Sequence, residues 1–97
     1  MHARMSIVSS DPDQLDRFVQ VLKDQIFPKA REWTGFKGLI SLNDRTSGKN
    51  ITAVLFENEE AMRASEEAGA KLRSEAMGAI GAPAPTVERY EVALFEV

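Results

Sequence analysis

The chain has 97 residues, with 12 Lys and Arg against 15 Asp and Glu, which give a net charge of −3. This length predicts one domain over residues 1–97 with one modest core, and a mildly acidic chain without a basic run is a poor candidate for nucleic-acid binding. The absence of cysteine excludes disulfides, thiolate catalysis, iron–sulfur clusters and Cys-based zinc sites.

The N-terminal part of the chain predicts a strand and then an amphipathic helix. Residues 3–9 form a short strand candidate with apolar alternation. Asp11, Pro12 and Gln14 are typical of a helix start, with Asp11 as the cap. Apolar residues then recur on one helical face, at Leu15, Phe18, Val19, Leu22 and Ile26.

This first helix is expected to be interrupted. Pro28 has no backbone donor and crowds the preceding turn, which predicts a kink or break near residues 26–27. A last helical turn is expected to carry Ala30 and Trp33, and Gly35 is the natural stop.

A β-hairpin is predicted in the middle of the chain. Residues 36–43 and 50–56 both have strand-like composition. The six residues between them are rich in turn formers, and Gly48 can take the positive φ that such a turn requires.

The C-terminal half predicts a second helix and a last strand. Asn58 is placed to cap a helix that runs to about Ala79, and Gly78 and Gly81 are expected to end it. Residues 86–97 then form the fourth strand. The resulting order, βαββαβ, predicts an α+β ferredoxin-like fold with a four-stranded antiparallel sheet and two helices on one face.

Both faces of this sheet are expected to be apolar. In the third strand Ile51, Ala53 and Leu55 point one way and Thr52, Val54 and Phe56 the other; in the second, Phe36, Ile40 and Leu42 oppose Leu39. Two helices cover only one face, and water on the other would cost several kcal/mol at about 25 cal/mol per Å². A homodimer joined through the sheet faces is therefore predicted.

Several segments resemble a known family. Residues 33–38 read Trp-Thr-Gly-Phe-Lys-Gly, and the Gly-Phe-x-Gly part matches the start of that family's second strand, with Thr34 in place of its usual Pro. Residues 56–61 (Phe-Glu-Asn-Glu-Glu-Ala) stand where the family has Trp-Glu-Ser-x-Glu-Ala, and residues 87–92 look like its last strand. On these motifs the chain resembles the antibiotic-biosynthesis-monooxygenase-like group of the dimeric α/β-barrel superfamily.

The resemblance implies a dimeric α/β barrel and more than one possible activity. Family members include cofactor-free oxygenases acting on aromatic polyketides, haem-degrading enzymes and proteins without known activity. The haem-degrading branch relies on an Asn, a Trp and a His. Here Phe56 falls near the place of that Trp, and the single His is His2, so haem degradation is not expected.

Four residues are candidates for lining a ligand pocket between sheet and helices: Trp33, Tyr90, Arg89 and Phe56. Trp33 suits stacking on a flat ligand, and its structural alternative is a core residue. Tyr90 suits hydrogen bonding or proton transfer to a substrate oxygen, and its structural alternative is a residue that only packs in the strand. Arg89 suits an anionic ligand, against a cross-strand ion pair with its neighbours Glu88 and Glu91.

The other titratable residues have structural interpretations. His2 has no carboxylate cluster near it in the sequence and is typical of a mobile terminus, so neither a metal nor a cofactor is predicted. Glu59 and Glu60 favour the start of the second helix, and Glu66 and Glu67 are expected to be solvated on its outer face.

The sequence thus leaves several function classes open. One is a small-ligand-binding or stress-associated dimer of this family; the alternative is a cofactor-independent monooxygenase acting on a small aromatic or polyketide-like compound, and a third is a purely structural dimer. The expected partners are a second copy and a small apolar or aromatic ligand, without nucleic acid or membrane. The chain lacks cysteine and a signal-peptide pattern, and it has no apolar run near the roughly 20 residues that a membrane span requires. A cytoplasmic location is therefore predicted.

Overall fold

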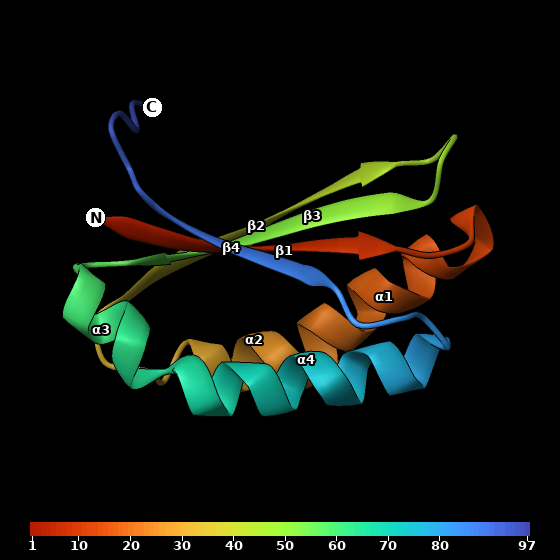
Figure 1. The fold of residues 1–97 in the computed structure, drawn as a ribbon, viewed down its shortest axis with the longest axis horizontal. Helices are drawn as coiled ribbons and strands as arrows, with labels where there is room; N and C mark the ends of the chain where they lie inside the picture. Colours follow the sequence, from red (N-terminus) through yellow and green to blue (C-terminus); the bar gives the residue numbers. More distant parts are fainter.

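A four-stranded antiparallel sheet is covered on one face by helices, and no segment of the chain covers the other face (Figure 1). The computed structural model describes residues 1–97. In sheet order the strands are β2 (Phe36–Asp44), β3 (Lys49–Phe56), β1 (His2–Ser9) and β4 (Thr86–Glu91). The helical segments are a 3₁₀ turn (Pro12–Gln14), α1 (Leu15–Val21), a π-helical turn (Leu22–Ile26), α2 (Phe27–Ala30), α3 (Glu59–Ala64) and α4 (Glu66–Ile80). The predicted ferredoxin-like βαββαβ fold is confirmed, and no helix has both the length and the apolar character to cross a membrane.

The predicted interruption of the first helix takes the form of a π-helical turn. The Phe27 N–H donates to the carbonyl of Leu22, five residues back, so the turn is wider by one residue before α2 begins. The expected place of Trp33 in the last helical turn is wrong. Because the Ala30 carbonyl accepts the Trp33 N–H only three residues on, at 3.0 Å, the chain leaves α-helical geometry and Trp33 lies in the following turn.

The two predicted N-caps have different outcomes. Asn58 caps α3 as predicted, since its Oδ1 accepts the Ala61 N–H at 2.8 Å. The predicted cap at Asp11 is wrong, because its side chain makes no such bond. The Gln14 N–H donates instead to the main-chain carbonyl of Asp11 at 2.9 Å, which closes the 3₁₀ turn and leaves the carboxylate outside it.

The long second helix predicted by the sequence is two helices that meet at Ser65. The Ser65 backbone (φ −98°, ψ 5°) leaves the helical region, and its Oγ donates to the Met62 carbonyl at 2.9 Å. Gly78, which was expected to end the helix, lies inside α4. The helix ends only at Gly81, whose left-handed conformation (φ +68°) provides the cap.

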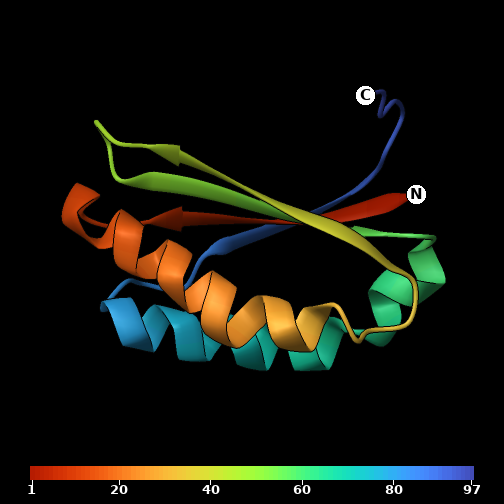
Figure 2. The same ribbon diagram turned by 180° about the vertical axis from the view of Figure 1, so that it is seen from behind.

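The last strand is shorter than the predicted span of residues 86–97. Its partner β1 begins at His2, which pairs with Glu91, and the final link is the Val92 N–H donating to the Met1 carbonyl at 2.9 Å. Beyond that point no neighbouring strand is left to pair with. The C-terminal segment instead rises from the sheet on the side opposite to the helices (Figures 1 and 2).

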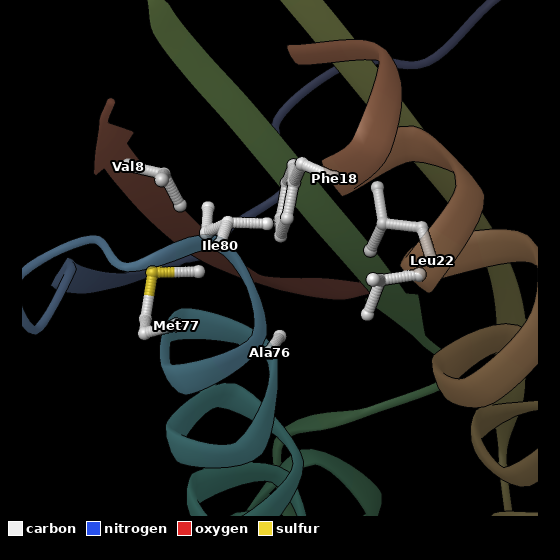
Figure 3. Close-up of a cluster of buried hydrophobic side chains, with 7 residues drawn as sticks. Val8, Phe18, Leu22, Ala76, Met77 and Ile80 are labelled. Carbon is white, nitrogen blue, oxygen red and sulfur yellow. The ribbon is translucent and has the colours of Figure 1, made fainter. Parts of the chain in front are cut away.

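The main core lies between the sheet and the helix pair. Phe18 and Leu22 from the first helix meet Met77 and Ile80 from α4 beneath Val8 of β1 (Figure 3). Val21 and Ala76 complete this buried cluster. Small residues on α4 allow the two helices to approach each other under the strands.

The face of the sheet turned away from the helices is apolar, as the strand pattern predicted. Because Val8 faces the helices, the register places the alternate residues on the opposite face: Ala3, Met5, Ile7, Ile40, Leu42, Ile51, Ala53, Leu55 and Tyr90. Ile40 and Leu42 are 51% and 54% exposed. The open face is therefore apolar over β2, β3 and β1, and β4 adds Tyr90 beside the polar residues Thr86 and Glu88.

Phe36 does not share this open face, contrary to the prediction that grouped it with Ile40 and Leu42. A β-bulge between Phe36 and Gly38 shifts the alternation of β2 by one residue. Phe36 is consequently on the helix side, opposite Phe56, and its ring packs edge-on against Phe27 with 6.0 Å between centroids.

We predict opposite effects of one substitution at two glycines. Gly48 has φ +82°, and an added Cβ would lie 1.8 Å from the Ser10 carbonyl oxygen, so Gly48→Ala should lower the free energy of unfolding by about 2 kcal/mol or more. Gly78 lies in α4 with open space beside it, so Gly78→Ala should raise that free energy by up to about 1 kcal/mol. Urea unfolding of both variants measures the difference; equal effects would contradict the described contact between the hairpin and Ser10.

Candidate functional site

A small cavity lies between the sheet and the helices, and residues of the main core such as Val8, Phe18 and Met77 line part of it. Its volume is about 40 Å³, which is room for a few water molecules at about 10–15 Å³ each. Its walls are mainly apolar and include Ile26, Trp33, Leu39, Val54 and Leu72. Polar groups interrupt these walls at four positions: Arg4, Ser6, Thr52 and Arg73.

Arg4 is the central charged group of this region. It comes from the central strand β1, faces the helices and is only 2% exposed. Its Nη1 donates to the Met62 carbonyl at 3.2 Å, to Ser65 Oγ at 3.0 Å and to Glu66 Oε1 at 3.1 Å. All three acceptors lie around the junction of α3 and α4, so the break in the predicted helix supplies the partners of the buried guanidinium.

Two aromatic rings lie against the same guanidinium. Its central carbon is 5.1 Å from the ring centroid of Phe56 and 5.6 Å from that of Trp33. The two rings are stacked, with centroids 6.2 Å apart and planes inclined by 16°. Burial lowers the pKa of Arg4, and the hydrogen bond that Arg4 donates to Glu66 opposes that effect. The cation–π contacts add to the stabilisation of a charge held away from water.

Glu66 bridges two arginines that face each other across neighbouring strands. Arg4 and Arg89 are register partners on β1 and β4. Arg89 binds Glu66 in a bidentate manner, with Nε to Oε1 at 2.9 Å and Nη2 to Oε2 at 2.6 Å. The hydrogen bond from Arg89, with the further bond from Arg4, lowers the pKa of Glu66 to about 2.

This arrangement corrects two predictions. The expected ion pair of Arg89 with Glu88 or Glu91 is wrong, because Arg89 faces the helices and reaches Glu66 on α4. The expected solvation of Glu66 on the outer face of the helix is wrong for the same reason, since its carboxylate is turned toward the sheet and pairs with two guanidinium groups.

The four predicted pocket residues fall into two separate places. Trp33 lines the cavity, and Phe56 lies fully buried behind it in the stacked pair. Arg89 and Tyr90 instead border an open polar groove that also includes His2. Tyr90 is half exposed, and its hydroxyl donates to Glu88 Oε1 at 3.0 Å, which raises the pKa of the phenol. A ligand-binding role for the four residues stays a prediction.

The polar groove does not present a metal-binding arrangement. His2 Nε2 lies 3.5 Å from Glu59 Oε2, and its Nδ1 is buried without a hydrogen-bond partner. Arg63 also pairs with Glu59. No three His, Asp or Glu side chains of the chain are placed so that they could hold a metal ion together.

The floor of the cavity is fixed by a hydrogen-bonded polar cluster between β2 and β3. Thr52 Oγ1 donates to Asn50 Oδ1 at 2.7 Å and lies 2.9 Å from Ser41 Oγ. Asn50 is fully buried and donates to Ser41 Oγ at 2.8 Å and Asn43 Oδ1 at 2.7 Å. Since these groups satisfy one another, the Thr52 hydroxyl has a defined position in the wall.

Sequence reasoning missed Arg4 and Arg73, the charged residues that actually line the cavity. A signal for Arg4 exists, because a lone arginine between Ala3 and Met5 in an apolar strand predicts a paired buried charge once that strand is central. Arg73 carries no comparable signal. It is one of several charged residues on a polar helix, and only the packing of α4 shows that it faces the cavity.

The Glu66 bridge predicts a pH dependence of stability. The carboxyl pKa is about 2 in the folded chain against an ordinary 4.5, so its stabilising contribution is complete above pH 4.5 and is lost as the pH falls toward 2. Solvent screening of this partly exposed group limits the contribution to about 1–2 kcal/mol. Glu66→Gln should lose this amount at pH 7 and show a flatter stability profile between pH 4.5 and 2 than the unmodified chain in urea titrations. Glu67→Gln is the control, since Glu67 makes no ion pair; identical profiles for the two variants would contradict the bridge.

Comparison with known sequences finds uncharacterized relatives. No family model matches the chain. The uncharacterized protein Rv2558 of Mycobacterium tuberculosis is 33% identical over 94 residues, which are 97% of this chain and 39% of that protein. The chain thus spans about two fifths of the length of the curated relatives it matches.

Solved structures share the whole fold. The monooxygenase from the gene ActVA-Orf6 of Streptomyces coelicolor, in complex with nanaomycin D, superposes with a TM-score of 0.73 at 17% identity, over 99% of this chain and 91% of that one. The heme-degrader MhuD of M. tuberculosis, with two hemes bound in its active site, gives a TM-score of 0.75 at 14% identity over 100% of both chains. At such identities the likeness establishes the fold and not the activity. The chain has the fold of the antibiotic-biosynthesis-monooxygenase-like proteins, as its motifs around Phe36 and Phe56 indicated.

Proposed function

We propose that the chain is a protomer of a homodimer that binds a small aromatic ligand in the cavity between sheet and helices. The observation that carries this proposal is the composition of the cavity wall. Trp33 and aliphatic side chains form an apolar surface, and Arg4 and Arg73 add guanidinium groups to it. An apolar cavity with a few convergent polar groups is the usual form of a small-molecule site.

Ligands of the structural neighbours support the same interpretation. Nanaomycin D and heme are both flat ring systems, and each is bound to a protein with this fold. The cavity of this chain is small, so the side chains around it must move apart for an aromatic ring to enter. One wall residue, Ile26, belongs to the π-helical turn that interrupts the first helix.

The homodimer part of the proposal rests on the open face of the sheet. Ile40 and Leu42 are half exposed there, and the C-terminal segment on the same side carries Leu94 and Phe95, which are 75% and 60% exposed. At about 25 cal/mol per Å² this apolar area favours association. A second copy presents the same surface, so two sheets packed face to face cover both and close a barrel.

A cofactor-independent monooxygenase acting on a small aromatic or polyketide-like compound is the second candidate. The favouring observation is that the Arg4 guanidinium and the Ser6 hydroxyl line the same cavity as Trp33. Such a reaction inserts one oxygen atom of O₂ into the substrate and reduces the other to water, with the substrate as reductant. Oxygen uptake with anthrone separates this function from binding alone.

Filling the cavity should abolish ligand binding. Ala76 lines the cavity from α4 and is 2% exposed, so Ala76→Leu places three more carbon atoms in it. The loss of toluene binding, measured by NMR shifts of the Trp33 indole N–H, is the expected result. Ala70→Leu, on the exposed surface of α4, should bind toluene normally. Leu39→Phe fills the cavity from β2 instead, and unchanged binding in both filled variants would refute the site.

The dimer should depend on the open face. Light scattering at micromolar concentration is expected to give twice the protomer mass for the unmodified chain. Ile40→Glu places a charge in the proposed interface and should give monomers, because burial of an unpaired carboxylate is costly. Ser74→Glu adds the same charge on the outer surface of α4 and should leave the dimer intact. A monomer in the unmodified chain contradicts the proposed assembly.

A further inference from the structure

Two guanidinium groups line the cavity, although the chain as a whole is acidic. Arg4 and Arg73 line the cavity, and Arg89 is linked to Arg4 through their shared partner Glu66. Glu66 is the one carboxylate that acts on the pKa of any of these three arginines. The group of three guanidinium ions and one carboxylate therefore has a positive excess within a chain whose net charge is −3.

Two of these guanidinium groups converge on the backbone of Gly69. A Cβ at this position would lie 2.6 Å from Arg4 Nη2 and 3.2 Å from Arg73 Nη1. Both nitrogen atoms thus approach the same point on α4 from different elements, one from the sheet and one from the helix itself. Only glycine leaves room for this approach, so the two like charges lie side by side at the wall of the cavity.

Arg73 differs from its neighbours in having no partner within the chain. Arg4 and Arg89 are both paired with Glu66, whereas Arg73 takes part in none of the chain's ion pairs or side-chain hydrogen bonds. Burial and the nearby charge of Arg4 lower the pKa of Arg73, and the guanidinium stays protonated at neutral pH. The Nη2 of the buried Arg4 likewise makes no hydrogen bond to the protein.

We propose that the cavity selects anionic ligands, namely small aromatic carboxylates whose carboxylate is held between Arg73 and Arg4 beside Gly69. A planar carboxylate matches the fork of a guanidinium group and offers acceptors to both arginines. The ring then lies against Trp33 and the aliphatic wall. This inference rests on the proposed ligand-binding function and assigns the ligand's charge.

The apolar walls favour a carboxylate on a ring over a free inorganic anion. Beyond the two arginines, the lining consists mostly of side chains without donors, such as Leu72, Val54 and Ile26. A free phosphate would lose its hydration there and meet, beyond the two arginines, only the hydroxyls of Ser6 and Thr52 as polar lining groups. A ring with a single charged end leaves the rest of its surface in apolar surroundings.

Benzoate and benzamide test the proposal, because they have the same size and differ in charge. Trp33 is the single tryptophan of the chain and lines the cavity, so its fluorescence reports binding. The unmodified chain should bind benzoate at least tenfold more tightly than benzamide, and only the binding of benzoate should weaken with added salt. Sodium phosphate should not quench Trp33, and it should weaken benzoate binding no more than sodium chloride of the same ionic strength.

Two variants locate the charge that is responsible. Arg73→Gln should remove the preference for benzoate over benzamide. Lys71→Gln removes the same charge from the exposed side of α4 and should keep the preference. Arg73→Lys, which keeps the charge without the planar fork, should give an intermediate preference.

The outcomes separate this inference from the function on which it rests. Equal affinity for benzoate and benzamide in the unmodified chain overturns the anionic selectivity and leaves the binding site in place. Absence of binding for both compounds overturns the site and the selectivity together. A preference that survives in Arg73→Gln overturns the assignment to Arg73, and this comparison stands if circular dichroism shows the variant to be folded.

Discussion

The buried guanidinium of Arg4 is the interaction on which this end of the molecule depends. A charge on a central strand, facing a layer of helices, needs partners because an unpaired buried ion destabilises a fold by about 3–5 kcal/mol. The chain provides them where α3 and α4 meet: the Met62 carbonyl, the Ser65 hydroxyl and the Glu66 carboxylate. The break between the helices and the charge on the strand are therefore parts of one arrangement.

That arrangement also positions the cavity. Arg4 lies against the stacked rings of Trp33 and Phe56, which connects the turn after α2 to β3. The core around Phe18 and Met77 holds the two helices together farther along (Figure 3). Between these two regions the lining of the cavity includes Gly69 from α4 and Ile26 from the π-helical turn. The cavity lies where the stacked pair ends and the main core begins.

Much of the fold could be predicted from local patterns, and the site could not. The helical spacing from Leu15 to Ile26, the Asn58 cap and the alternation of β3 are signals within a few residues of one another, and each had a structural counterpart. The pairing of Arg89 with Glu66 depends on which face of β4 packs on α4, which strand composition does not encode. The early end of β4 depends on where β1 begins, and the side of the sheet on which Phe36 lies depends on a β-bulge. Neither feature could be predicted without the register of the whole sheet.

The close approach at Gly69 has a consequence for how such a chain diverges. Any larger side chain there would meet the Arg4 guanidinium, so a change at this position requires the end of the Arg4 side chain to shift or the residue at position 4 to be shorter. Positions 4 and 69 are therefore expected to covary in an alignment of homologues. Homologues that keep this part of the cavity wall should have arginine at position 4 together with a small residue at position 69.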